Sequence, residues 1–383
     1  MNIQKRYLVD DIPDEILINI LAKLPAKTLR RCMCVCKEWK SLIVDHINTH
    51  LRQSSAIKYS IIFYGDLNDY LPKLLLFRDN TVEDLELPVF KCLQLDNADV
   101  FKFVFVGSCN GLVCFNHWED CTVIWNPVTG EKRLLPEPIL DSNPNKFDYH
   151  ISFGFDHVNN DYKLVKVIEN NSSFELRVQI FRLSTNSWRK VKRVSGYRMA
   201  LFRTFEIVNG VLYLMGARQI REDEDEINTC ILRFNFCNKE FQEILDLPST
   251  CKNGGWIKLS KWKESIAVVE RLSEKLFVEI EYNFWIINDE RRSSWTKLFK
   301  ISGCGCYIND YTSLFLGTYK DQLVFDQYVK ATNHNELTLL DVSHHEDYMN
   351  NHITIKNFGT SDPMFSFNTF DYVESLIPVN HIS

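Results

Sequence analysis

The strongest constraint on this chain is a repeat of about fifty residues that begins near residue 55 and continues toward the C-terminus. Each unit contains short apolar runs rich in Val, Ile, Leu and Phe, separated by polar turns, which is typical of β-strands. Six such units, each with about four strands, predict an all-β domain, a six-bladed kelch-like β-propeller. Corresponding strand ends recur at Phe77, Trp125, Leu183, Phe236, Ile287 and Leu340.

The two ends of the repeat region indicate how the ring closes. Residues 367–373 (FNTFDYV) repeat residues 202–208 (FRTFEIV) nearly letter for letter, and the latter have the position of an innermost strand. The first unit, near residues 57–95, contains only three candidate strands. We therefore expect the C-terminal strand to complete the first blade, which also removes an exposed sheet edge. A two-sheet sandwich is the alternative architecture.

The first fifty residues have a different, helical pattern. Ile12, Ile16, Ile20 and Leu24 recur every four residues and predict an amphipathic helix that begins at Pro13 and ends before Pro25. A second helical stretch is predicted over residues 26–43. So short a bundle has little core of its own, and we expect its apolar stripe to be buried against a partner. The expected domains are therefore a helical module at 8–50 and an all-β domain at 55–379.

The helical module resembles an F-box, in about forty residues with specific spacing. The matching pattern is Ile-Pro-x-Glu-Ile-Leu from residue 12, Ile-Leu-x-x-Leu-Pro from residue 20, and Lys-x-Trp from residue 37. It departs at Ile12, where leucine is commoner. The resemblance implies binding to a Skp-type adaptor and, through it, to a cullin scaffold. The residues that it assigns to this contact, or to the small core beneath it, are Ile12, Pro13, Ile16, Leu17, Ile20, Leu24, Pro25, Leu29, Val35 and Trp39.

The repeat region is similar to the plant F-box-associated interaction domain. The resemblance rests on residues 107–113 (GSCNGLV), 125–130 (WNPVTG), 161–165 (DYKLV) and 372–376 (YVESL). Some members of this family are S-locus F-box proteins of pollen self-incompatibility, and the sequence does not place the chain in or out of that subgroup. The double glycine of true kelch blades occurs only at 254–255.

Composition excludes several classes of function. The net charge of −6 argues against a dedicated nucleic-acid binder. No run of eighteen apolar residues predicts a membrane helix, and the N-terminus lacks a signal-peptide core, so we expect a protein of the cytoplasm and/or nucleus. The twelve cysteines lack Cys-x-x-Cys or zinc spacing, which predicts free thiols, no metal and no cofactor. Without a catalytic motif, we expect a chain that is not an enzyme.

These observations lead to an expected function with two alternatives. The resemblance implies the substrate-recognition subunit of a Skp–cullin–F-box ubiquitin ligase, whose propeller binds a target protein for ubiquitination and proteasomal degradation. A propeller enzyme with a helical cap and a non-degradative scaffold remain open. Self-incompatibility is a possible specialised role.

We expect the target to bind the face formed by the loops between second and third strands. An acidic run in one of these loops would attract a basic partner, although a solvated hairpin tip is the simpler reading. The candidate residues on this face are His117, Trp118, Glu222, Asp223, Glu224, Asp225, Glu226, Arg271 and His334.

Overall fold

A computed structural model of the chain describes most of the predicted elements. The described residues are 12–47, 50–51, 59–65, 72–78, 81–85, 103–117, 121–139, 147–170, 175–199, 205–219, 227–238, 241–248, 251, 256–272, 281–289, 294–301, 314–319, 322–329, 334–342, 352–357 and 368–379. In this part of the chain, no helix is long and apolar enough to cross a membrane.

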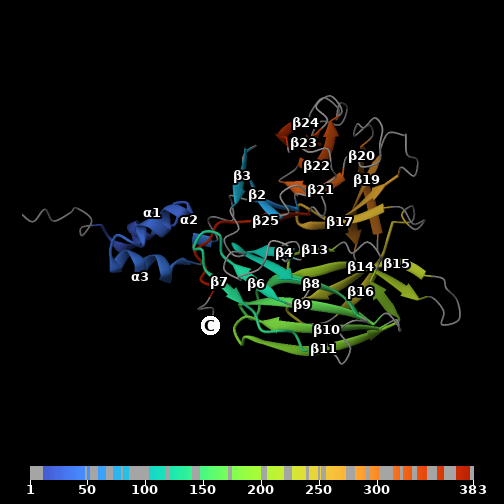
Figure 1. Ribbon diagram of the computed structural model, residues 1–383, viewed down its shortest axis with the longest axis horizontal. Coiled ribbons are helices and arrows are strands. Elements are labelled where there is room, and N and C mark those ends of the chain that lie inside the picture. The colour runs from blue at the N-terminus through green and yellow to red at the C-terminus, as the bar shows by residue number, and fades with distance from the viewer. Residues whose placement is uncertain are drawn as a thin grey trace, which may run out of the picture.

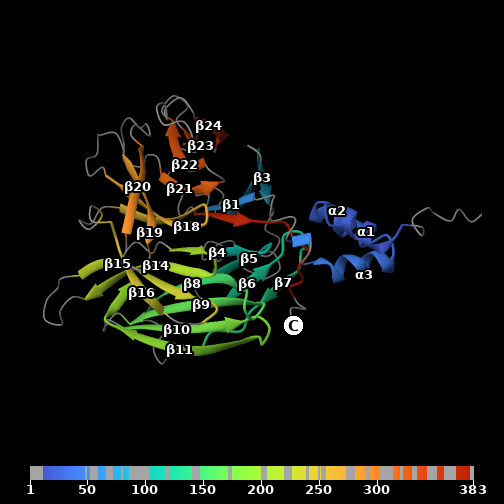
Figure 2. The same ribbon diagram turned by 180° about the vertical axis from the view of Figure 1, so that it is seen from behind.

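Three short helices form the N-terminal module, and they project from one side of a β-domain (Figures 1 and 2). They are α1 (Asp14–Leu21), α2 (Ala26–Cys32) and α3 (Lys37–Asp45). Prolines directly precede α1 and α2, where the missing N–H costs nothing.

The expected single helix over 26–43 is wrong, because the chain breaks between α2 and α3. Cys36 is extended, with φ −155° and ψ 170°, and its Sγ accepts the backbone N–H of Trp39 at 3.4 Å. A side-chain acceptor at this position caps a new helix and leaves the preceding residues in a turn. Cys32 and Cys36 therefore do not share one helical face.

The strands that the structure describes pair antiparallel into six sheets, which together form an all-β propeller (Figure 1). The first sheet contains β1 (Tyr59–Gly65), β2 (Pro72–Arg78), β3 (Thr81–Leu85) and β25 (Asn368–Tyr372). The second contains β4 (Phe103–Cys109), β5 (Leu112–His117), β6 (Thr122–Trp125) and β7 (Lys132–Leu134). The third contains β8 (Phe147–Asp156), β9 (Asp161–Asn170), β10 (Glu175–Arg182) and β11 (Ser187–Ser195).

The remaining sheets repeat the same up-and-down order. The fourth contains β12 (Tyr197–Met199), β13 (Phe205–Val208), β14 (Val211–Gln219), β15 (Ile227–Asn235) and β16 (Phe241–Asp246). The fifth contains β17 (Trp256–Trp262), β18 (Ser265–Arg271), β19 (Tyr282–Asp289) and β20 (Ser294–Ile301). The sixth contains β21 (Leu314–Tyr319), β22 (Gln322–Val329), β23 (His334–Asp341) and β24 (His352–Asn357).

The C-terminal strand joins the first sheet, as the sequence repeat predicts. β25 pairs antiparallel with β1, from Tyr59 opposite Tyr372 to Phe63 opposite Asn368. On its other sides β25 contacts β21 and β4, so the last and second sheets meet at the chain's end. This closure gives β1 a partner along its open edge and excludes the two-sheet sandwich.

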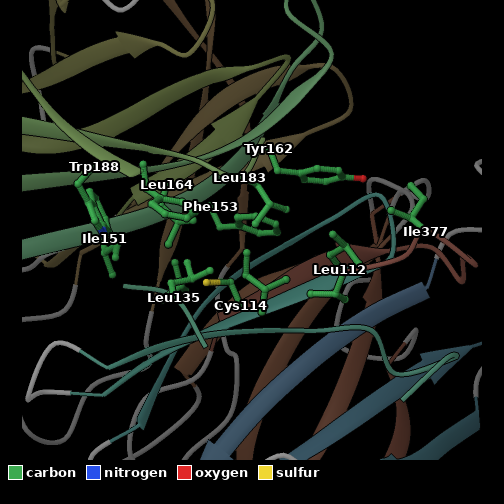
Figure 3. Close-up of a cluster of buried hydrophobic side chains, with 14 residues drawn as sticks. Leu112, Cys114, Leu135, Ile151, Phe153, Tyr162, Leu164, Leu183, Trp188 and Ile377 are labelled. Carbon is green, nitrogen blue, oxygen red and sulfur yellow. The ribbon is translucent and has the colours of Figure 1, made fainter. Parts of the chain in front are cut away.

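The apolar cores lie between neighbouring sheets rather than within one. Between the second and third sheets, Cys114, Phe153, Leu164 and Trp188 pack in one cluster (Figure 3). Comparable clusters join the first and second, third and fourth, fourth and fifth, and fifth and sixth sheets. Many of the aromatic side chains fill these wedges, and this packing holds each sheet against the next.

A buried ion pair also joins the third and fourth sheets. The side chains of Lys163 and Asp156 are completely buried and paired, and Lys163 Nζ donates to the carbonyl oxygen of Phe236 at 2.7 Å. Asn159 Nδ2 donates to the same carboxylate at 2.6 Å. Burial alone raises the pKa of Asp156, but hydrogen bonds from Lys163 and Asn159 outweigh it and hold that pKa far below its usual range. The Asp156 carboxylate therefore stays ionised at neutral pH.

Candidate functional site

The ten residues that the F-box pattern selects divide between an exposed face and a covered face of the helical module. Ile16 is 53% exposed and Val35 65%, and Ile20 is also exposed. Leu17 and Leu29, in contrast, are buried. The exposed members are Ile12, Pro13, Ile16, Ile20, Pro25 and Val35, and the half-buried members are Leu24 and Trp39. The exposed apolar members define what we call the apolar face (Ile12, Ile16, Ile20 and Val35).

The covered face packs on the propeller. Leu17, Leu21 and Leu29 share one buried cluster with Val128, from the β6–β7 turn, and Leu376, which follows β25. The family-like segments WNPVTG and YVESL therefore meet at the helices, although they are far apart in the sequence. The module's small core is completed by the propeller, which explains how so short a bundle remains folded.

Polar contacts fix the same junction. Arg30 Nη1 donates to the Val128 carbonyl oxygen at 2.6 Å, and Lys27 Nζ lies 3.6 Å from a Glu374 carboxylate oxygen. His50 Nε2 lies 2.8 Å from the carbonyl oxygen of Leu24 and ties the end of the helical module back to its start. Together with the apolar cluster, these bonds hold the helices in one orientation on the propeller.

The C-terminal tail itself is held by buried polar groups of the second sheet. Asn126 Nδ2 donates to the carbonyl oxygens of Ser375 and Ile377, at 3.1 and 2.8 Å. Asn126 Oδ1 accepts the N–H of Val128 at 2.8 Å, so one side chain shapes the turn and secures the tail. We call this arrangement of the β6–β7 turn (126–131) and the tail (374–379) the helix seat.

Gly111 allows the tail to pass close to the second sheet. Its φ is +84°, in the left-handed region that favours glycine. A Cβ on Gly111 would lie 2.7 Å from the carbonyl oxygen of Val373, which is closer than real Cβ contacts. The family-like Asn-Gly turn therefore serves tail docking as well as the hairpin between β4 and β5.

Shortening one side chain of the helix seat is expected to destabilise the junction. Leu376→Ala removes buried apolar atoms and leaves a cavity, which costs about 2–5 kcal/mol. Hydrogen exchange should therefore accelerate in α1 and α2. Leu134→Ala is the matched control, because Leu134 is exposed on β7. Unchanged exchange in the Leu376 variant would show that the seat does not hold the helices.

The structure describes the side chains of two of the predicted target-face residues, His117 and Arg271. His117 ends β5 and is only 4% exposed, so its side chain is not part of an exposed face. Arg271 ends β18 and is half-buried. His334 begins β23, and its side chain lies outside the described residues. The predicted residues that lie wholly outside them are Trp118, Glu222, Asp223, Glu224, Asp225 and Glu226.

A cavity of about 300 Å³ lies where one strand from each of the six sheets converges. Its lining comes from β4, β8, β13, β17, β21 and β25 and from the turns that follow several of them. Asn209, His157 and Asp371 are exposed there, whereas Phe153 and Tyr372 are buried walls. We call this cavity the central pocket. The sequence pattern did not single it out.

The central pocket shares one face of the propeller with the helix seat. In an antiparallel sheet, the turn after the first strand and the turn after the third strand lie at the same end. The pocket is lined by turns of the first kind, at 110 and 209–210, and the seat uses the β6–β7 turn, which is of the second kind. β25 connects the two sites directly, since 370–373 line the pocket and 374–379 form the seat.

The central pocket is lined by three charged groups, Glu206, Lys261 and Asp371, and a fourth group outside the lining, Lys258, acts on Glu206. Lys261 Nζ pairs with an Asp371 carboxylate oxygen at 2.7 Å. Burial raises the pKa of Glu206 to about 7, and the negative charge of Asp371 raises it further. The hydrogen bond from the Ile207 N–H and the positive charges of Lys261 and Lys258 lower this pKa and oppose the rise only in part. Burial also lowers the pKa of Lys258 to about 7, although Glu206 opposes this change. No group of three or more His, Cys, Asp or Glu side chains suited to a metal occurs among the described residues.

Comparison with known proteins gives matches over both parts of the chain. The family profile described as F-box associated beta propeller domain matches residues 75–379, and the F-box domain profile matches residues 9–51. The chain is similar to the Arabidopsis thaliana F-box protein At3g07870, with 26% identity over 62% of this chain and 60% of that protein. It is 25% identical to the putative F-box protein At3g16210 of the same plant, over 88% and 84% of the two chains. Among solved structures, TolB from Acinetobacter baumannii aligns with a TM-score of 0.43 and 11% identity, over 78% of this chain and 65% of that one.

Proposed function

The chain belongs to the F-box-associated β-propeller family of plant F-box proteins, and from this premise we propose that it is the substrate-recognition subunit of a Skp–cullin–F-box ubiquitin ligase. The observation that carries the proposal is the apolar face, where Ile12, Ile16, Ile20 and Val35 stay exposed on helices whose other side is covered. Ile16 and Ile20 lie one turn apart on α1, and exposed apolar patches of this kind mark protein interaction sites.

Each residue of the F-box pattern has a role in this proposal. Ile12, Ile16, Ile20 and Val35 contact the Skp-type adaptor, and the exposed prolines Pro13 and Pro25 start α1 and α2 beside them. Leu17 and Leu29 support that surface from beneath. The residues that complete this support are Leu24 and Trp39.

The propeller, in this proposal, holds a target protein while other subunits carry out the ubiquitin transfer. We interpret the six sheets as six blades of one ring, with the chain end closing it. The chain contributes proximity rather than chemistry, because holding two reactants together replaces a bimolecular encounter. The acidic loop 222–226 remains a candidate target contact, and we assign the complex to the cytoplasm or nucleus.

The helix seat gives the proposed complex a defined geometry. Since the helices are bonded to the β6–β7 turn and to the C-terminal tail, the adaptor and the propeller face are held at a fixed angle. A target on the propeller then stays at a constant position relative to the cullin scaffold.

Reconstitution from purified components tests the proposal. The full chain, mixed with a Skp-type adaptor, is expected to elute as a one-to-one complex in size-exclusion chromatography, and addition of a cullin should extend that complex. Affinity purification from plant cells with the proteasome blocked should then recover a target that carries ubiquitin. Separate elution of chain and adaptor at micromolar concentration would overturn the proposal.

A further inference from the structure

The central pocket has the size of a binding site for one side chain. Its volume of about 300 Å³ is at the lower end of the range for ligand pockets. The two half-buried rings of Phe205 and Phe370 contribute apolar surface, with their centroids 6.4 Å apart. Ser108 and Asn209 add polar groups to the same lining. A long side chain with an apolar stem and a polar head fits such a lining better than a folded segment does.

Among the charged groups at the pocket, the Glu206 carboxylate is the candidate partner for a positively charged head, although Lys258 and Lys261 also act on it. Lys261 is engaged by Asp371 at 2.7 Å, and Lys258 Nζ donates to the Phe315 carbonyl oxygen at 3.3 Å. The Glu206 carboxylate, among the described residues, accepts one hydrogen bond, from the N–H of its neighbour Ile207 at 3.1 Å. Its second oxygen has acceptor capacity for a donor that enters the pocket.

From this arrangement we propose that the central pocket binds an arginine side chain of the target protein, with the guanidinium on Glu206 and its plane against Phe205 and Phe370. Arginine suits the site better than lysine, because it keeps its charge when it is desolvated and stacks on aromatic rings. This inference rests on the proposed function and adds a recognition element to it. It also places the target on the propeller face that carries the helix seat.

A binding titration with a small arginine derivative tests whether the central pocket binds an arginine side chain. The full chain is titrated with Nα-acetyl-arginine amide, and Nα-acetyl-citrulline amide serves as a neutral probe of nearly equal shape. We expect saturable, millimolar binding of the arginine probe and at least about tenfold weaker binding of the citrulline probe. Equal binding of the two probes, or no saturable binding of either, would overturn the proposal without any variant.

Two matched variants test whether the Glu206 carboxylate is the charge that binds the arginine probe. Glu206→Gln is expected to weaken arginine binding about 10- to 100-fold. Glu264→Gln removes the same formal charge from an exposed turn residue outside the pocket lining, and binding should stay within about twofold. Equal losses in both variants would mean general electrostatic attraction and would contradict a specific site. Thermal unfolding of each variant checks that the propeller is intact.

The affinity for the arginine probe should also depend on pH. Because the pKa of Glu206 is raised to about 7, its carboxyl is mostly protonated at pH 6 and mostly ionised at pH 8. Lys258, whose pKa is lowered to about 7, loses positive charge over the same interval. The other charged groups that face this carboxyl are Asp371 on β25 and Lys261 on β17, with His157 at the rim. Affinity is therefore expected to rise about tenfold from pH 6 to pH 8, and the Glu206→Gln variant should lose most of this rise.

The adaptor assay separates failure of this inference from failure of the proposed function. The Glu206→Gln variant must still form the complex with the Skp-type adaptor, because Glu206 lies outside the helix seat and the apolar face. A chain that binds the adaptor but not the arginine probe disproves the pocket assignment alone. A chain that binds the probe but no adaptor disproves the ligase role.

Discussion

A chain that carries both Ile16→Asp and Ile20→Asp is expected to lose at least 99% of its binding to a Skp-type adaptor. About half of each isoleucine is exposed, so burying the rest in the complex contributes roughly 0.8–1.5 kcal/mol per residue. Losing both contacts therefore weakens the complex by about 10- to 100-fold. Each aspartate adds to this loss, since a carboxylate must give up its water at the interface. Surface plasmon resonance with immobilised adaptor measures the change.

The same double variant should remain folded, because both isoleucines are exposed and make no contribution to the covered cluster. Val158→Asp provides the matched control, since it places the same charge on an exposed apolar residue of the propeller. Leu17→Asp would be a poor test, because Leu17 is buried in the cluster with Val128 and Leu376. Full adaptor binding by the double variant would assign the contact to another surface.

Lys163→Met should lower the free energy of unfolding by about 3–5 kcal/mol. The substitution leaves Asp156 buried without its cation, and an uncompensated buried charge is strongly destabilising. It also removes the bond to the Phe236 carbonyl, which joins the third sheet to the fourth. Denaturant-induced unfolding of the full chain, monitored by tryptophan fluorescence, measures the change.

A double-mutant cycle distinguishes the charge from the packing in this region. Asp156→Asn combined with Lys163→Met removes both charges, and its loss should be smaller than that of Lys163→Met alone. Lys190→Met, on the exposed edge strand β11 of the same sheet, should change stability by less than about 0.5 kcal/mol. If the double variant were as unstable as Lys163→Met alone, the unpaired Asp156 carboxylate would not be the cause of the lost stability.

The regular features of the fold could be predicted from the sequence because they are local or periodic. Alternating apolar runs and tight turns predicted the strands, and the likeness of 367–373 to 202–208 predicted the pairing of β25 with β1, which is confirmed. The inner strand at 202–208 is described only as β13 (Phe205–Val208), which pairs with β14. The helix break at Cys36 was missed, because a thiol cap is a weak signal inside an otherwise helical pattern.

The candidate site was predictable only in part. A spacing of four residues drifts by about 40° per step around a helix. In addition, Ile12 and Leu24 lie outside α1 (Asp14–Leu21), so the predicted stripe is not one continuous helix face. Which side of the helices is covered depends on Val128 and Leu376, and these approach only after the ring has closed. The central pocket could not be predicted from the sequence either, because its lining residues come from six strands that are far apart in the chain.

The position of the tail also bears on protein synthesis. The F-box pattern is translated long before the residues that seat it, 374–379, which directly follow β25. A nascent or truncated chain therefore has helices without their seat and a first sheet without its fourth strand. Because domains fold as they leave the ribosome, the chain can orient its three helices on the propeller only after β25 has joined the first sheet.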